Sequence, residues 1–178
     1  MNPGTPSPSS AELLKQLESK DPALVLKALH KLEKAGRISD LPAIIKIMSN
    51  LDDPRLLNEF EEFLSNVRSK DAPPILAHSL EDPTYSRIRT ELTRSCWESQ
   101  LDYSPYLMIF AMMFIAGDYL LALEAFTVIE NTCLERPVNE DMIKSISLLV
   151  KNSLPDQPET KQRLAKELIL VLEPFTGE

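Results

Sequence analysis

Glycine is scarce in this chain of 178 residues, and its scarcity counts against whole classes of fold. Only four glycines are present, and two of them, Gly4 and Gly177, lie at the ends of the chain. Glycine supplies the backbone conformations that tight β-turns and phosphate-binding loops require. The sequence therefore argues against a turn-rich β fold and against a glycine-dependent nucleotide loop.

Residues that bind metals or act as nucleophiles are also few. The chain has two histidines, His30 and His78, and neither has a partner at metal-ligand spacing. Its two cysteines, Cys96 and Cys133, form no C-x-x-C motif, and there is no G-x-S-x-G. We interpret both cysteines as reduced, buried apolar residues. The sequence therefore predicts no metal, no cofactor, no catalytic residue and no enzymatic activity.

Positive charge and long apolar runs are missing as well. The formal net charge is −8, and no five consecutive residues are lysine or arginine, so we expect no nucleic-acid partner. The N-terminal sequence MNPGTPSPSS has neither the basic nor the apolar region of a signal peptide. No apolar stretch reaches the roughly 18 residues that a membrane span needs. We therefore predict a cytoplasmic protein that does not contact membranes.

The chain does contain a short sequence motif that recurs at similar intervals. Four helical apolar patterns open on an aspartate, three times with proline next, at steps of 32, 29 and 36 residues: Asp21-Pro22, Asp53-Pro54, Asp82-Pro83 and Asp118. A second phrase, an aspartate with proline two or three residues later, recurs between them at steps of 31 residues: Asp40, Asp71 and Asp102. Aspartate caps the first N–H groups of a helix, and proline fits the first helical position because its missing N–H has no helical partner.

Two interleaved helix starts at this period indicate helix pairs that stack on one another. We predict an all-α fold: a right-handed α-solenoid of about four to five antiparallel helix pairs, similar to HEAT or armadillo arrays. Apolar residues follow the first helices at offsets +3, +7 and +11 from the aspartate: Leu24, Ala28 and Leu32; Leu56, Phe60 and Leu64; Leu121, Ala125 and Ile129. The third unit departs, with a stripe shifted by one residue after its first position: Tyr85, Ile88, Leu92 and Cys96.

The ends of the predicted domain are marked by composition. Residues 1–9 are rich in proline and serine, which predicts a disordered tail. Ser10 is the expected N-cap of a short first helix. A last helix is predicted from about Glu159 to Glu173, before Pro174, either to cap the open end of the stack or to pair with another copy. We therefore place a single domain at residues 10–174.

The repeat resembles HEAT repeats, especially the short bacterial HEAT-like type. The resemblance rests on Asp82-Pro83 followed by Ile88-Arg89, and on Asp21-Pro22, Ala28-Leu29 and the phrase Leu41-Pro42-Ala43-Ile44-Ile45. It covers roughly residues 20–150, although the arginine has no counterpart in the second unit, where Asn58-Glu59 stands. The resemblance implies an α-solenoid that binds a partner through its concave surface.

The segment from Tyr103 to Gly117 is the most suggestive binding element. It holds three methionines and several aromatic side chains, so the helix is apolar on all sides. Burial between neighbouring units explains this composition, and exposure in a groove for an apolar helix or peptide is the alternative. For that groove we predict partner contacts from five residues: Tyr106, Met108, Met112, Trp97 and Tyr103.

The carboxylates offer a weaker functional alternative. Glu59 and Glu62 flank the stripe residue Phe60 and are expected to face outward as part of a solvated surface. The same groups could attract a basic peptide.

These observations favour a non-enzymatic scaffold that binds a protein or peptide through its concave helix surface, as a monomer or a weak homodimer. Two alternatives remain at this stage. One is an enzyme-associated HEAT-like protein of the lyase type, whose signature is mostly the repeat itself. The other is a small structural adaptor that self-associates through its terminal helix.

Overall fold

The computed structural model describes residues 9–176, and within this range all regular secondary structure is helical, with no strand. The all-α prediction is therefore confirmed. Ten α-helices follow one another: α1 (Ser10–Leu17), α2 (Pro22–Ala35), α3 (Leu41–Met48), α4 (Pro54–Ser65), α5 (Ala72–Glu81), α6 (Arg89–Glu98), α7 (Leu107–Ala116), α8 (Tyr119–Glu135), α9 (Glu140–Ser153) and α10 (Glu159–Leu172). Four short 3₁₀ helices lie between them, η1 (Ile38–Asp40), η2 (Pro83–Ile88), η3 (Ser104–Tyr106) and η4 (Leu154–Asp156), and a fifth, η5 (Glu173–Phe175), follows α10.

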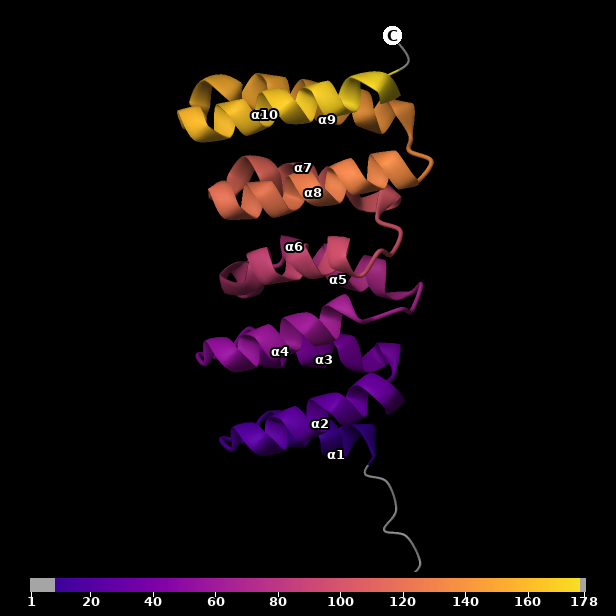
Figure 1. The fold of residues 1–178 in the computed structure, drawn as a ribbon, viewed down its shortest axis with the longest axis vertical. Coiled ribbons are helices and arrows are strands. Elements are labelled where there is room, and N and C mark those ends of the chain that lie inside the picture. The colour runs from indigo at the N-terminus through magenta and orange to yellow at the C-terminus, as the bar shows by residue number, and fades with distance from the viewer. Residues whose placement is uncertain (1–8, 177–178) are drawn as a thin grey trace, which may run out of the picture.

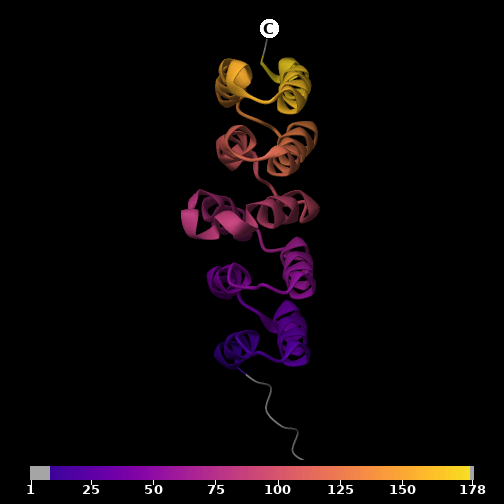
Figure 2. The same cartoon turned by 90° about the vertical axis from the view of Figure 1, so that its left-hand side faces the viewer.

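The α-helices form two rows along the long axis of the molecule (Figures 1 and 2). In one row, α2, α4, α6, α8 and α10 each pack on the next. In the other, α1, α3, α5, α7 and α9 do the same. Successive α-helices alternate between the two rows (Figure 2). Residues about 30 positions apart therefore lie side by side in neighbouring helices of one row.

The core lies between the two rows and extends along the whole stack. Its largest fully buried side chains come from nearly every level, from Leu17 in α1 through Phe60 in α4 to Phe110 and Phe114 in α7. Each helix turns its apolar side toward the core between the two rows. Burial of that side removes its apolar surface from water, which stabilises the fold. Among the described residues, no helix is both long and apolar enough to cross a membrane.

The aspartates at the helix starts behave as caps in the first series and differently in the second. Asp53 accepts a hydrogen bond from the Arg55 N–H at 2.9 Å, and Asp118 accepts one from the Leu121 N–H at 2.9 Å. Asp71 makes no such bond at α5, because its backbone is already in the helical region, so the prediction that it caps that helix was wrong.

The first helix is capped one residue earlier than predicted. Ser9, and not Ser10, is the N-cap of α1, and it forms a reciprocal capping box with Glu12. Ser10 is the first helical residue, and its hydroxyl instead donates to Asp40, which also accepts the Arg37 N–H at 2.9 Å. Ser9 therefore belongs to the helix start, whereas residues 1–8 of the predicted tail lie outside the described residues.

The shifted stripe of the third unit has a local cause. The segment after Asp82 does not begin as an α-helix but as the 3₁₀ helix η2, and α6 starts only at Arg89. A 3₁₀ helix has about 3.0 residues per turn, so Tyr85 and Ile88 share a face at a spacing of three. The spacing returns to four from Ile88 to Leu92 and Cys96, where the α-helix takes over.

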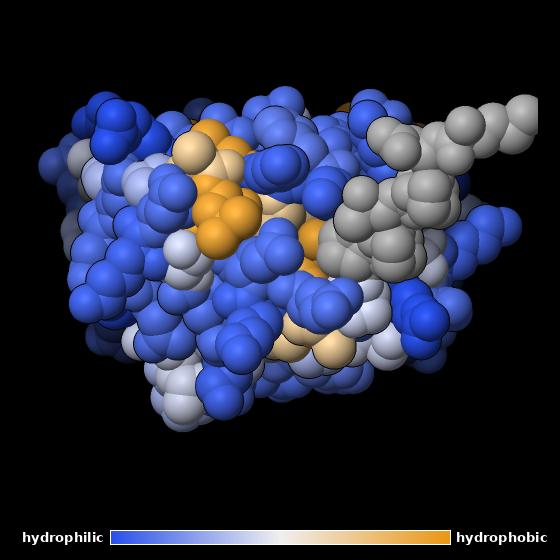
Figure 3. All heavy atoms as spheres, turned by 90° about the horizontal axis from the view of Figure 1, so that it is seen from below, coloured by the Kyte–Doolittle hydropathy of each residue, from blue (hydrophilic) through white to orange (hydrophobic). Residues whose placement is uncertain are grey.

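The N-terminal end of the molecule shows one departure from the predicted stripes. Leu24 is 37% exposed on α2, and the buried positions there are Val25, Ala28, Leu29 and Leu32. Figure 3 views this end, where a few apolar side chains interrupt a mostly hydrophilic face.

The C-terminal end is closed by α10, which packs on both α8 and α9. Lys161 fixes its start: the ammonium is buried, and it donates to the carbonyl oxygens of Ile115 at 2.9 Å and Gly117 at 2.8 Å. These carbonyls lie at the end of α7, where no helical N–H remains to pair with them. Burial lowers the pKa of Lys161, and the nearby charge of Asp118 opposes this shift.

Candidate binding site in the trough over α6

Helix α6 lies at the bottom of a shallow trough between α4 and α8. None of its residues from Arg89 to Glu98 is fully exposed, whereas both neighbours present exposed side chains beside it. The wall from α4 is polar, with Asn58, Glu62 and Asn66. The wall from α8 is apolar, with Leu120 and Leu123 exposed by 49% and 37%. We call this surface the α6 trough.

Arg94 at the bottom of the trough joins three successive helices. Its Nη1 lies 3.0 Å from Glu61 Oε1 on α4, and its Nη2 lies 2.8 Å from Glu124 Oε1 on α8. Its Nε also donates to Glu124 at 2.9 Å, so the guanidinium grips that carboxylate through two nitrogens. Both glutamates are buried, and the Arg94 side chain keeps 31% of its surface exposed to the trough.

Trp97 is held by the same carboxylate. Its indole Nε1–H donates to the second oxygen of Glu124 at 2.8 Å. Glu124 therefore satisfies both Arg94 and Trp97, and it fixes the orientation of an aromatic ring and a cation along the floor. Rings and guanidinium groups that are held in this way lose little further entropy when they bind something.

The trough carries more negative than positive charge. Burial raises the pKa of Glu61, because it outweighs the attraction of Arg94, and the charges of Glu98 and Glu91 raise it further. The pKa of Arg94 is raised despite its burial, by the hydrogen bond to Glu124 and by the charges of both glutamates. The Arg94 guanidinium thus lies among several carboxylates, and Arg136 adds a second guanidinium at the far end of the trough toward α8.

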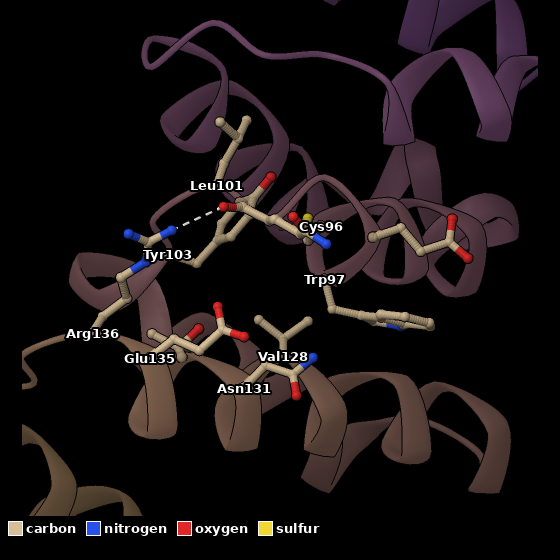
Figure 4. A pocket seen from close by; sticks show the side chains of 11 residues that line it. Cys96, Trp97, Leu101, Tyr103, Val128, Asn131, Glu135 and Arg136 are labelled. Atoms are coloured by element: carbon tan, nitrogen blue, oxygen red, sulfur yellow. Dashed lines mark hydrogen bonds between the residues drawn. The ribbon is translucent and has the colours of Figure 1, made fainter.

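Two hollows open along α6, one on each side of Glu98. The hollow toward α4 has a volume of about 280 Å³ and is lined in part by Asn58, Glu62 and Arg94. The hollow toward α8 has a volume of about 280 Å³ as well (Figure 4). Trp97 and Asn131 lie on its two sides in that view.

The far end of the second hollow is built by an unusual loop. Gln100 has a φ of 58°, in the left-handed region that favours glycine. Arg136 donates from Nη2 to the Gln100 carbonyl at 3.0 Å and so ties this loop to the end of α8. Below it, the ring of Tyr103 packs edge-on against Phe110, with centroids 5.6 Å apart.

The sulfur atoms near the trough are not poised for chemistry. Cys96 is buried beneath the hollow, and burial raises the pKa of its thiol to about 12. Burial likewise raises the pKa of Cys133 to about 11. Both thiols are therefore neutral near pH 7, and the prediction that both cysteines are buried is confirmed. Within residues 9–176, no group of three His, Cys, Asp or Glu side chains is arranged to hold a metal ion.

The structure separates the five predicted contact residues into two groups. Trp97 and Tyr103 both line the hollow between α6 and α8, although only 1% of Tyr103 is exposed. Tyr106, Met108 and Met112 lie in the other row, on η3 and α7. Met112 is 47% exposed there, and Tyr106 packs edge-on against His78, with centroids 5.5 Å apart.

Sequence reasoning missed the polar network that organises the trough. Glu61, Arg94 and Glu124 lie 8, 12 and 6 residues after the aspartates that precede their helices, so an alignment on those aspartates does not bring the three charges together. Their contact depends on how α4, α6 and α8 pack on one another. The acidic wall was foreseen in part, because Glu62 was expected to face outward, and it is exposed.

Comparison with protein-family models and with curated protein sequences gives no match. Among solved structures, the chain is similar to the crystal structure of an engineered protein, a structural-genomics target. The two share 15% identity over 93% of this chain and 80% of the other, with a TM-score of 0.48. A similarity of this size carries no inference about function.

Proposed function

We propose that this protein is a non-enzymatic interaction module, built as a HEAT-like α-solenoid of stacked helix pairs, which binds a segment of a partner protein in the α6 trough. The observation that carries the proposal is the pair Arg94 and Trp97, fixed by Glu124 at the bottom of the trough. Arginine and tryptophan are the residue types most often responsible for binding energy at protein interfaces.

Two further features support the trough as the binding surface. It is flanked on both sides by hollows of about 280 Å³, which leave room for side chains of a partner. Its α8 wall exposes leucines next to polar groups, and such a mixture is typical of interfaces that exchange water for a partner.

The test is site-specific photocrosslinking in the native host. A benzophenone amino acid replaces Asn131, beside the hollow, or Met112, on the exposed side of α7. We expect one protein to be captured from position 131 and not from position 112. Capture from position 112 alone would move the binding surface to the α7 side, and no capture at either position would contradict the proposal.

The captured protein is then purified and titrated calorimetrically against the wild type and Trp97→Ala. We expect this substitution to weaken binding about tenfold or more, the effect of losing an aromatic anchor. Circular dichroism of the variant controls for folding. Unchanged affinity in a folded variant would remove Trp97 from the site.

A further inference from the structure

The two walls of the α6 trough differ in character, and the difference defines what fits between them. On the α8 side the exposed groups form an apolar strip: Tyr119, Leu120, Leu123 and Leu134. On the α4 side they are a carboxylate and two amides, Glu62, Asn58 and Asn66, and on α6 the half-buried Glu98 adds a second carboxylate. A ligand that satisfies both walls must be apolar on one side and positively charged on the other.

The length of the apolar strip favours a helix as the occupant. Helices α4 and α8 both pack on α6, so their axes are about 16–20 Å apart, twice the usual helix spacing. Each of these helices extends about 5–6 Å from its axis, so a partner helix about 10–12 Å across would rest over α6 on the outward edges of α4 and α8 and would not enter between them. The apolar strip runs from Tyr119 to Leu134, about 22 Å, which matches about four turns of helix.

The apolar strip is distinctive within its own row. At 100° per residue, the outward positions of α8 are Tyr119, Leu120, Leu123, Thr127, Glu130 and Leu134, four of which are apolar. The outward positions of α2 include Leu24, Lys27, His30 and Lys34, and those of α10 include Arg163, Lys166, Glu167 and Leu170, so each exposes one large apolar side chain where α8 exposes four. A solvated helix surface normally carries charges as α2 and α10 do.

A second copy of this chain, docked trough to trough, is a poor occupant. Its net charge is −8, and its own exposed strips are bordered by Glu98 and Glu130, so two copies would bring like charges together. A basic segment has no such conflict. The negative charge of the carboxylates in the trough exceeds the positive charge of Arg94, so lysines and arginines of the segment are attracted to them.

We propose that the α6 trough binds a basic amphipathic helix of a partner protein, with its apolar side on the α8 strip and its cationic side toward Glu62 and Glu98. The inference rests on the proposed function and specifies its partner. Trp97 lies between the two walls, where it can contact the boundary between the apolar and the charged sides of the helix.

The experiment uses a fluorescein-labelled 16-residue peptide with leucines on one helical side and lysines on the opposite side. A second peptide has glutamates in place of the lysines. Binding to the full chain is followed by fluorescence anisotropy at several salt concentrations. We expect the lysine peptide to bind, its affinity to fall as salt rises, and the glutamate peptide not to bind.

Two pairs of variants locate the binding. Leu123→Glu alters the apolar wall, and Leu24→Glu is its matched control, because both leucines are 37% exposed and α2 lies well away from α8. Glu62→Lys alters the acidic wall, and Asp141→Lys on α9 in the other row is its control. We expect each wall variant to weaken binding about tenfold and each control to change it less than twofold.

Equal effects of wall and control variants, or equal binding of the two peptides, would overturn the inference. Failure of this inference can be told apart from failure of the proposed function. A crosslinked natural partner that depends on Trp97 but tolerates Glu62→Lys leaves the trough as a binding site and removes the basic helix. If the lysine peptide binds specifically in the trough but no partner is crosslinked, the preference for a basic helix stands and the proposed function fails.

Discussion

At the scale of single residues, Arg94 is the side chain whose loss we expect to lower the stability of the fold most clearly. It is the cation between two buried carboxylates on different helices, and its loss would leave both without a counter-charge. Removing one partner of a buried ion pair is far more costly than removing one partner of an exposed pair, since the remaining charge stays desolvated.

We predict that Arg94→Ala lowers the free energy of unfolding by about 2 kcal/mol, less than for a fully buried pair because a third of the side chain is exposed. Arg163→Ala is the control: its pair with Glu159 spans 2.6 Å but is exposed, so we expect a loss of less than about 0.5 kcal/mol. Urea denaturation of both variants measures the difference. Equal losses would mean that the central network contributes no more than a surface pair.

Glu61 makes stability depend on pH in an unusual direction. Its pKa is raised above the ordinary value of 4.5 by burial, so the folded state binds more protons than the unfolded state just above that pH. Its contribution to stability is therefore greatest at low pH and is lost as the pH rises through the folded pKa. We expect the wild type to lose stability relative to Glu61→Gln as the pH rises from 4.5, measured by thermal melts. A wild type that gains stability relative to the variant over this range would show that Arg94 outweighs burial.

At the scale of the helix, the starts of the elements show which sequence signals hold. Asn139 accepts the Met142 N–H at 2.9 Å at the start of α9, whereas Asp71 makes no capping bond at α5. Both residues look like caps in the sequence, but a cap needs an extended backbone, and Asp71 has a helical one.

We predict that Asn139→Ala costs about 1 kcal/mol of stability and that Asp71→Ala costs less than about 0.3 kcal/mol. Chemical denaturation of the two variants, side by side, gives both values. A comparable loss for Asp71→Ala would indicate that its carboxylate stabilises α5 through the helix dipole instead.

Lys161 ties the last helix to the stack through the carbonyls of Ile115 and Gly117. We expect Lys161→Met to leave these carbonyls unpaired and to increase amide hydrogen exchange in α10 more than in α2. Exchange measured by mass spectrometry resolves the two helices. Since burial lowers the pKa of Lys161, the wild-type lysine should contribute more to stability as the pH rises from its folded pKa toward 10.5, and the variant should lack this rise. Uniform exchange in both helices would contradict the local role.

The sequence allowed the elements to be predicted well and the site only in part. Helix starts at Asp21, Asp53 and Asp118 could be read because capping and periodicity are local properties. The 3₁₀ helix η2 was visible only as a shifted stripe, since nothing local distinguishes it from an α-helical start. The trough could not be predicted, because it depends on how far α6 lies below its neighbours, which packing between helices decides.

At the scale of the whole molecule, α10 is the element that closes the stack. It buries Leu164, Leu168 and Leu172 against α8 and α9, while Leu170 remains 62% exposed. Helix α10 therefore covers apolar surface of both α8 and α9 at this end of the molecule.

We predict that a chain ending at residue 158 aggregates or loses cooperative unfolding, because removal of α10 exposes apolar surface of α8 and α9. Light scattering of both chains over a concentration series tests this, with the intact protein expected to remain a monomer. A dimeric intact protein that becomes a stable monomer on truncation would instead identify α10 as a self-association surface.

The two buried thiols can report how often the helices that carry them open. Cys96 lies on the floor helix of the trough and Cys133 on its apolar wall helix, and neither reacts while its helix stays in place. When the thiol reagent is concentrated enough to react before the helix closes again, the rate at which it modifies each cysteine equals the rate at which that helix opens. Anything that settles over α6 should slow both reactions without touching either sulfur, so occupancy of the trough can be timed in the natural protein without any label.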